Sequence, residues 1–265
     1  MDEYTGWAAP VATIAVVFSR RKRSSAPPDE DAVIGRALCL SAVTMLGAIA
    51  DGVEDGTMEA TAASKYLVES HRWLIRENLA AALSSDEKAL LSKEIVDWTP
   101  GERRGAGRRN EAMGVLLWAL SALDALPPYG TSFERLPSFV PLLAATSEFR
   151  GAARLRSPDE LEHARETAAI WHWRIRSRQR EEGREPHADG DHDLDAITRE
   201  TAAAAFAKGS IPAPVEDDFP VHGKPLRALD ADDYADVAVS AVERHYALNW
   251  LAGRAADLDH VPTDS

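Results

Sequence analysis

The chain has 265 residues, 45% hydrophobic and 28% charged, a composition that is ordinary for a soluble globular protein and excludes disorder of the whole chain. Asp and Glu outnumber Lys and Arg by 43 to 30, so the formal net charge is −13, and nucleic acid and anionic membranes are excluded as general partners. The acidic excess favours solubility, and the alternative is a docking surface for a basic protein.

The chain begins with a predicted strand over residues 11–18, followed by a basic, Ser/Pro-rich loop that extends to residue 28. The run VATIAVVF is short and rich in β-branched residues, which is typical of a strand. The basic cluster follows this run, whereas in a signal peptide it comes first, and the run is too short to span a bilayer. Residues 29–265 are then expected to form one helical domain.

The first predicted helix covers residues 29–51, with acidic residues in its first turn and Gly52 at its end. Arg36 lies on its apolar side. Because polar residues interrupt the apolar run 33–50, we expect a core helix of a soluble protein and not a membrane span. Cys39 is the only cysteine of the chain, so a buried thiol and a reducing, cytoplasmic location are expected.

Two helices are expected next, the first over residues 58–83 and a shorter one opened by a capping box of Ser84 and Glu87. Residues 99–101 (TPG) are typical of a turn. The Gly-rich, basic run 102–109 (ERRGAGRR) suggests a phosphate-binding loop. No P-loop or dinucleotide fingerprint accompanies it, so a flexible solvated loop is favoured.

A central helix is predicted for residues 109–126, which are apolar on nearly all sides. On this helix Glu111 shares a face with Trp118. A carboxylate on an apolar face needs a cation. Glu111 is therefore the natural partner for Arg244 or Arg36.

The clearest local signal lies at residues 157–160 (SPDE), which combine an N-cap Ser, a Pro at the first helical position and a Glu at the third. The helix that follows ends in the charged stretch 174–184, which is expected to reach into solvent. Residues 183–195 are predicted to form a flexible acidic loop. A helix over residues 194–208 and an extended segment with a short strand, over residues 209–226, follow.

The helix predicted for residues 232–253 organises the chain, because its apolar positions recur at helical spacing and form one adhesive face. Arg244 falls inside this stripe, and burying an unpaired guanidinium is very costly. The neighbouring helices must therefore supply a carboxylate or carbonyl oxygens. We expect this helix and those that begin near residues 109 and 159 to pack on one another.

Charged and aromatic residues on apolar helix faces form the candidate site. Its members are Arg36, Glu111, Trp118, Trp171, Arg174, Glu243, Arg244 and Trp250. The charges either pair internally and fix the helix register, or line a polar pocket for an anionic or amide-bearing ligand. We favour the structural interpretation, since ion-pair networks also perturb local chemistry without catalysing anything.

Metal ligands and catalytic side chains are sparse in the sequence. Glu160 and His163 form one E-x-x-H pair, whereas di-metal carboxylate bundles use two such pairs and two further glutamates, so a solvated helix start is favoured. Carboxylates within residues 189–200 are spaced as in an EF-hand loop, but Leu194 stands where glycine is required. No nucleophile–base–acid set can be assembled, and no cofactor is predicted.

Three blocks are distinctive: RRNEAMGVLLWAL at 108–120, RSPDELEHARETAAIWHWRIR at 156–176, and ERHYALNWL followed by DLDHVPTDS. Together they resemble a bacterial family of mostly helical domains of unknown function that is catalogued by number only. The resemblance extends over about residues 32–265 and implies a mostly helical fold but no activity. The tail of the family usually carries a Trp where this chain has Leu258. The resemblance singles out Arg109, Glu111, Trp118, Trp171, Glu243, Arg244, Leu248, Trp250 and Leu251.

The sequence thus predicts a mainly α, single-domain multi-helix bundle with a short N-terminal β-strand. The expected function is that of a non-catalytic cytoplasmic module that binds another protein, such as a regulatory or toxin-neutralising one, with no nucleic-acid or membrane partner. This expectation rests on the negative charge and on the lack of an assembled catalytic set. The alternative is an enzyme or small-ligand binder that uses the buried Arg/Glu cluster, or a metal held by Glu160 and His163.

Overall fold

A capped apolar helix opens the structure, a computed structural model that describes residues 26–183, 193–255 and 258. The side chain of Asp29 accepts a hydrogen bond from the backbone N–H of Ala32, which caps α2 (Glu30–Glu54). Gly52 does not end this helix, because a glycine inside a helix costs only about 1 kcal/mol relative to alanine.

The described residues form eight α-helices, short 3₁₀ turns and one small hairpin, so the fold is mainly α-helical as predicted. After α2 come α3 (Ala60–Arg76), α4 (Ser85–Leu91), α5 (Pro100–Ala119), α6 (Ser147–Ala152), α7 (Pro158–Glu181), α8 (Leu194–Ala207) and α9 (Ala231–Leu251). The 3₁₀ turns are η1 (Ala80–Ala82), η2 (Ile95–Asp97), η3 (Leu136–Phe139) and η4 (Leu226–Ala228). The predicted strand at residues 11–18 lies outside the described residues.

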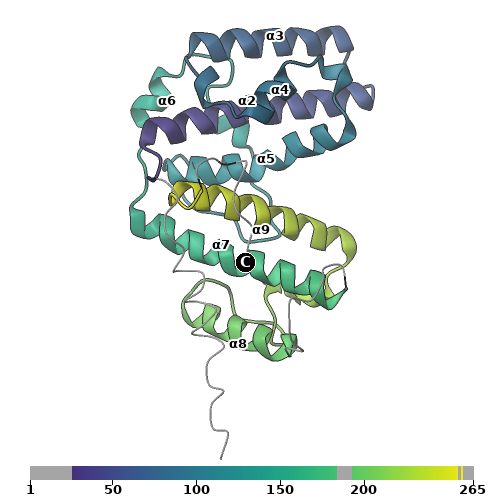
Figure 1. Ribbon diagram of the computed structural model, residues 1–265, viewed down its shortest axis with the longest axis vertical. Coiled ribbons are helices and arrows are strands. Elements are labelled where there is room, and N and C mark those ends of the chain that lie inside the picture. Colours follow the sequence, from purple (N-terminus) through teal and green to yellow (C-terminus); the bar gives the residue numbers. More distant parts are fainter. Residues whose placement is uncertain (1–25, 184–192, 256–257, 259–265) are drawn as a thin grey trace, which may run out of the picture.

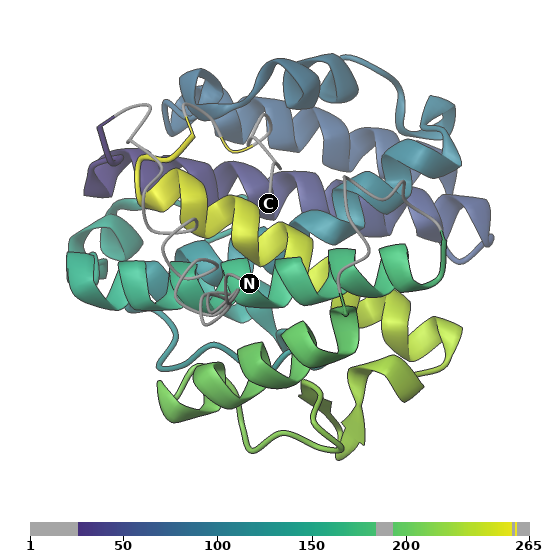
Figure 2. The same ribbon diagram turned by 60° about the horizontal axis from the view of Figure 1, so that its bottom comes forward.

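The only sheet among the described residues is a two-stranded antiparallel hairpin. It pairs β1 (Pro220–Val221) with β2 (Lys224–Pro225), with Pro220 opposite Pro225 and Val221 opposite Lys224. This hairpin lies within the segment 209–226, for which a short strand was predicted. Figure 2 shows it beside α8, at the end of the molecule that comes forward in that view.

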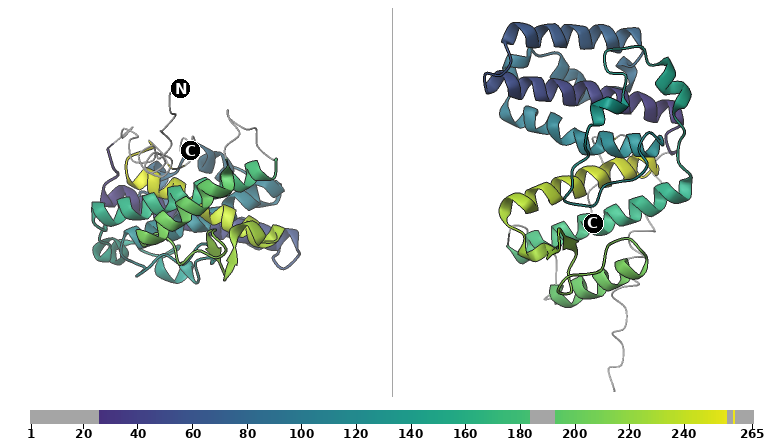
Figure 3. Two further views of the ribbon diagram at one scale, coloured as in Figure 1. Left: turned by 90° about the horizontal axis from the view of Figure 1, so that it is seen from below. Right: turned by 180° about the vertical axis from the view of Figure 1, so that it is seen from behind.

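The helices stack in layers (Figures 1 and 3): α3 and α4 cover α2, and α5, α9, α7 and α8 follow in that order. The last helix in the chain therefore lies between two earlier ones. The predicted packing of α9 on α5 and on α7 is confirmed. Direct packing of α5 on α7 was a wrong prediction, because α9 separates these two helices.

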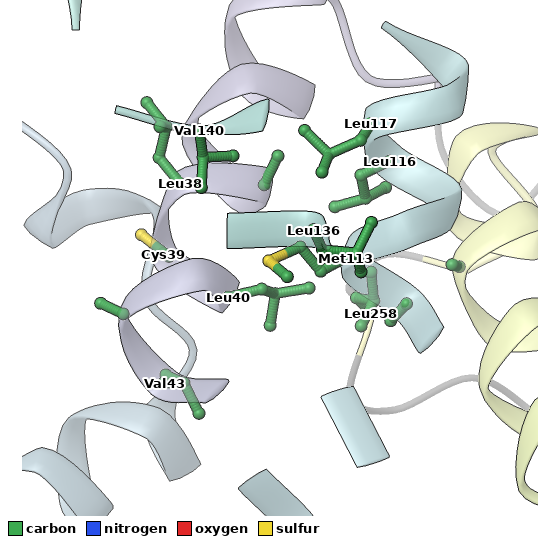
Figure 4. Packing of buried hydrophobic residues seen from close by; sticks show 14 of the residues in the cluster. Leu38, Cys39, Leu40, Val43, Met113, Leu116, Leu117, Leu136, Val140 and Leu258 are labelled. Carbon is green, nitrogen blue, oxygen red and sulfur yellow. The ribbon is translucent and has the colours of Figure 1, made fainter. Parts of the chain in front are cut away.

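Two apolar clusters hold the layers together. The larger one joins α2, α3 and α5 and includes the buried Leu258, and Figure 4 shows Met113, Leu40 and Leu136 in its interior. The smaller one lies among α7, α8, α9 and the hairpin and includes Phe219, whose ring contacts the rings of Trp171 and Trp173. By length and composition alone, α2 could cross a bilayer. However, 78% of its most apolar 18-residue stretch is buried inside this fold, as in a core helix.

The turn and loop predicted at residues 99–109 are instead the N-cap and first turns of α5, so that prediction was wrong. Thr99 and Glu102 form a capping box and Pro100 occupies the first position of α5, so this segment starts a helix instead of interrupting one. Ala106 then packs against Gly47 of α2, where an added Cβ would lie only 2.7 Å from the Cβ of Ala106. This close helix–helix contact offsets the low helix propensity of the glycines in the segment.

Candidate functional site

Arg244 lies at the centre of the layered helices, and α9 directs its guanidinium at α5 and the loop after it. Its Nε donates to Glu111 Oε2 at 2.7 Å, its Nη1 donates to the carbonyl of Pro127 at 2.6 Å, and its Nη2 donates to the carbonyl of Thr131 at 3.0 Å. Only 1% of Arg244 is exposed. The pairing of Glu111 with Arg244, predicted from their positions on apolar faces, is therefore confirmed.

Aromatic rings close over the same guanidinium. The rings of Tyr129 and Phe133 have their centroids 4.8 and 5.0 Å from the Arg244 Cζ. Tyr129 in turn stacks on Trp171 with a centroid distance of 4.5 Å, and burial raises the pKa of Tyr129 above its usual range. All three guanidinium nitrogens donate to protein oxygens, and aromatic rings cover the group. Arg244 therefore connects α9 to α5 and to the loop that follows α5.

Arg174 forms a second buried ion pair, at the other end of the stack. Its Nε and Nη2 donate to the two carboxylate oxygens of Asp218 at 2.7 and 3.0 Å, and its Nη1 donates to Glu181 at 3.1 Å. Burial alone would raise the pKa of Asp218, but the hydrogen bonds and charge of Arg174 hold it below its usual range. The Asp218 side chain is fully buried.

The charged end of α7 reaches into solvent only at residues 181–183, whereas Arg174 and Arg178 are buried, so that prediction was wrong for the first part of the stretch. Arg178 is also buried and donates to the backbone carbonyls of Leu226 and Leu229 at 2.6 and 2.9 Å. The 3₁₀ turn after the hairpin lies over α7, and its carbonyl oxygens need donors once water is excluded. Arg178 supplies these donors, and Arg174 supplies the counter-charge for Asp218.

Arg36 has a third set of partners. It donates to both carboxylate oxygens of Glu87 at 2.6 and 2.9 Å and to the carbonyl of Ala82 at 2.8 Å. The same carboxylate closes the capping box of α4 with Ser84. The sequence revealed the capping role of Glu87, but it gave no signal for its second role as the partner of Arg36.

The three tryptophans of the candidate site are packing residues. Trp118 and Trp250 belong to the larger apolar cluster, and Trp171 belongs to the smaller one. Arg156, which was not among the predicted site residues, donates to the carbonyl of Trp118 at 2.8 Å, and its Cζ lies 4.9 Å from the centroid of the Trp118 ring. The only feature of the sequence that pointed to Arg156 was its spacing of four residues from Glu160, with which it forms an ion pair.

Glu243, the last charged member of the site, faces a groove separate from Arg244. It pairs with Arg109 at 3.6 Å, on the wall of a cavity of about 510 Å³ among α4, α5 and α9 that we call the polar groove. Lys93 and Glu102 form another ion pair on its wall, at 2.5 Å. Because cations and carboxylates on the wall compensate each other, the polar groove favours neither an anion nor a cation.

A more apolar groove of about 420 Å³ lies between α2, α5 and the loop that contains η3. We call it the methionine groove, because three of the four methionines of the chain line it: Met45, Met58 and Met113. Ala48 is an exposed residue of its wall. Methionine is unbranched and flexible, so such a surface can adjust to the shape of a partner. The apolar run of α2 predicts a core face and gives no sign of a groove.

The C-terminal end of α2, where Gly52 lines the methionine groove, is acidic, and its carboxylates lie outside the groove lining. Asp51 and Glu54 lie in the last turns and Asp55 is the C-cap residue, while the last turn of α2 has no basic residue. Carboxylates at a helix C-terminus oppose the helix dipole. Arg103 of α5 compensates part of this charge through contacts to Asp51 at 3.3 Å and to Glu54 at 3.5 Å. We call Asp51, Glu54 and Asp55 the acidic rim.

The metal candidates Glu160 and His163 are not brought together as ligands. Glu160 accepts hydrogen bonds from the backbone N–H and the hydroxyl of Ser157 and from Arg156, so its carboxylate completes the cap of α7, and His163 is exposed. Over the ranges 26–183 and 193–255 no three His, Cys, Asp or Glu side chains cluster as a metal site would require. Most of the acidic loop predicted at 183–195 lies outside the described residues.

A buried pair of histidines lies between α7 and α9. The rings of His172 and His245 have centroids 4.7 Å apart, and both residues are buried. Burial, and secondarily the positive charge of Arg176, lower the pKa of His172 to about 4. This ring is therefore neutral at physiological pH and packs as part of the helix interface.

Comparison with known proteins gives a family and no function. The family model described as "Domain of unknown function (DUF4272)" matches residues 9–196. The match includes the blocks at 108–120 and 156–176 and ends before α9. No curated protein and no solved structure matches the chain significantly. Since the match covers well over half of its length, the chain belongs to the DUF4272 family, whose function is unknown.

Proposed function

We propose that this protein is a non-catalytic, cytoplasmic module that binds another protein, and that the methionine groove is its docking site. The observation that carries the proposal is a 420 Å³ groove, lined largely by apolar side chains and by three methionines, that is open at the surface between α2, α5 and the η3 loop. Grooves of this kind accept apolar side chains of a partner helix or segment.

The hydrogen bonds of the buried arginines support a structural role for these residues more than a role in ligand binding. Arg244, Arg174 and Arg36 each bond to a carboxylate and to further protein oxygens, so these guanidiniums have their donors engaged within the fold. A binding site for an anionic ligand would instead direct such donors into a cavity. Their function is to fix the layers of the bundle that hold the groove.

The single thiol supports the non-catalytic assignment. Cys39 is buried in α2, and burial raises its pKa to about 12. The thiolate, which is the nucleophilic form, is then scarce at neutral pH. A buried free thiol also suits a reducing compartment, in line with a cytoplasmic location.

The test is retrieval of partners from the native host by wild-type protein and by two matched variants. Ala48→Gln places a polar chain in the methionine groove, whereas Ala203→Gln makes the same change on an exposed face of α8. Both positions are helical and exposed, and glutamine is a good helix former, so neither variant should lose stability.

We expect a partner that is retained by wild type and Ala203→Gln and lost by Ala48→Gln. The proposal fails if no protein is retained reproducibly, or if every retained protein is bound equally by Ala48→Gln. Equal binding would place any interaction surface outside the methionine groove.

A further inference from the structure

We propose, on the basis of the proposed function, that the methionine groove binds a basic amphipathic helix of the partner protein. In such a helix apolar anchors on one face would enter the groove, and Lys or Arg side chains beside them would contact the acidic rim. Neither the family assignment nor the sequence motifs imply a partner of this class.

The length of the groove fits a helix. Its wall on α2 runs from Ser41 to Gly52, which is about three turns or roughly 16 Å of helix. A partner helix that presents anchors at positions i, i+4 and i+7 needs roughly 10 Å between its first and last anchor. Two or three anchors can therefore be seated along α2 at once.

The two walls differ in a way that suits apolar anchors. On one side Met45 and Met58 are partly exposed and can change rotamer, while Val140 and Leu142 of the η3 loop form the other side. Adjustable thioethers facing branched side chains can close around anchors of different shape. The site would therefore select the apolar stripe of a helix more strongly than one particular side chain.

The η3 loop also carries features of a binding surface. Arg135 and Leu143, which bound it, both have left-handed backbone conformations, with φ of 55° and 60°. Such strain in non-glycine residues is found preferentially at functional sites. Phe139 of the same loop is 40% exposed, which gives the partner a further apolar contact beside the groove.

The charge of the partner follows from the acidic rim. Asp51 and Glu54 are mostly exposed and share one cation, Arg103, and all three rim carboxylates lie at the negative end of the α2 dipole. A cationic side chain placed there gains from the carboxylates and from the dipole together. An acidic or neutral segment gains from neither, so the rim selects a basic one.

The test uses synthetic peptides of about 14 residues and fluorescence anisotropy with the full chain. The probe has leucines at i, i+4 and i+7 spacing and lysines elsewhere; one control peptide scrambles the leucines and another replaces lysine by glutamate. The protein variants are Ala48→Gln and Glu54→Lys, matched by Ala203→Gln and Glu200→Lys on α8. Glu200→Lys makes the same change in net charge as Glu54→Lys, away from the groove.

We expect the lysine probe to bind wild type more tightly than either control peptide. Ala48→Gln should weaken it by at least about tenfold and Glu54→Lys by at least about threefold, while the two α8 variants should not. Equal binding of the scrambled probe, or equal loss in Glu200→Lys, would mean non-specific attraction to an acidic protein and would overturn the proposal.

A photo-crosslinking phenylalanine derivative in place of Phe139, the exposed ring beside the groove, identifies the natural occupant and leaves the groove itself unfilled. Crosslinks to a Lys/Arg-rich helix of a partner support the proposal. Crosslinks to an acidic or neutral partner segment would refute the basic helix while leaving the proposed protein-binding function intact. Crosslinks to a second copy of this chain, or to its own residues 1–25, would overturn both.

Discussion

Removing the Arg244 guanidinium should destabilise the fold far more than its packing volume suggests. Arg244→Met keeps an unbranched apolar side chain among Tyr129 and Phe133 but strands the buried carboxylate of Glu111. Breaking one side of a buried ion pair costs about 3–5 kcal/mol. The two backbone carbonyls that Arg244 caps lose their donor at the same time, which adds to this cost.

The companion change Glu111→Leu separates these contributions. In the double variant Arg244→Met/Glu111→Leu no charge is stranded, so most of the ion-pair penalty disappears. The carbonyls of Pro127 and Thr131 still lack donors, which leaves a loss of roughly 2 kcal/mol. Recovery should therefore be large but incomplete, with a coupling energy of about 1–3 kcal/mol between the two positions.

Urea unfolding of wild type, both single variants and the double variant measures these terms. Far-UV circular dichroism and tryptophan fluorescence should report the same transition for each protein, which justifies a two-state treatment. A loss below about 1 kcal/mol in Arg244→Met, or additive losses within roughly 0.5 kcal/mol, would refute the view that this ion pair fastens α9 to α5.

Three further predictions concern other parts of the fold. The pKa of His172 is about 4 in the folded state and about 6.5 in the unfolded chain, so the unfolded chain takes up the proton first as the pH falls. The free energy of unfolding should therefore fall by up to roughly 3 kcal/mol between about pH 6.5 and about pH 4. In unfolding measurements across this range, His172→Phe should show a smaller decline. Asp218→Asn should cost about 3 kcal/mol, because Arg174 loses its main counter-charge, whereas the exposed Glu200→Gln should leave the urea midpoint unchanged. A chain that ends at residue 196, where the family match ends, lacks α9, which packs on both α5 and α7. This fragment should therefore show no protected amides in hydrogen exchange. Cooperative unfolding of the fragment would contradict the packing described.

Local signals in the sequence predicted much of the fold. The capping residues Ser84 and Ser157 gave two helix starts, and both capping boxes are present. Thr99 has the same spacing to Glu102, but Pro100 and the glycines that follow are typical of a turn and loop, so the sequence did not predict this helix start. Proline at the first helical position favours a helix, and the contact of α5 with α2 outweighs the glycines.

The position of charged residues on apolar helix faces predicted the ion pair of Arg244, but not the partners of Arg174 and Arg178, for a physical reason. Glu111 and Arg244 each lie on a periodic helix, so their burial could be inferred from spacing alone. The partner of Arg174 is Asp218, 44 residues away in a segment without periodicity, and the carbonyls bound by Arg178 carry no side-chain signal at all. Such contacts are fixed only when the layers are assembled.

The methionine groove could not be predicted because a groove depends on three elements at once. Met45 and Ile49 belong to the apolar stripe of α2, which the sequence shows. Whether another helix covers that stripe or leaves part of it open depends on where α5 and the η3 loop lie. Periodicity shows that a face is apolar, but not what covers it.

The most direct test of this account compares probe binding by two folded variants, Arg244→Met/Glu111→Leu and Ala48→Gln. If the buried charges are structural and binding occurs in the methionine groove, the double variant should bind the lysine probe as wild type does, and Ala48→Gln should bind it at least about tenfold more weakly. Loss of binding in the double variant together with full binding by Ala48→Gln would contradict the account and place the site at the arginine core.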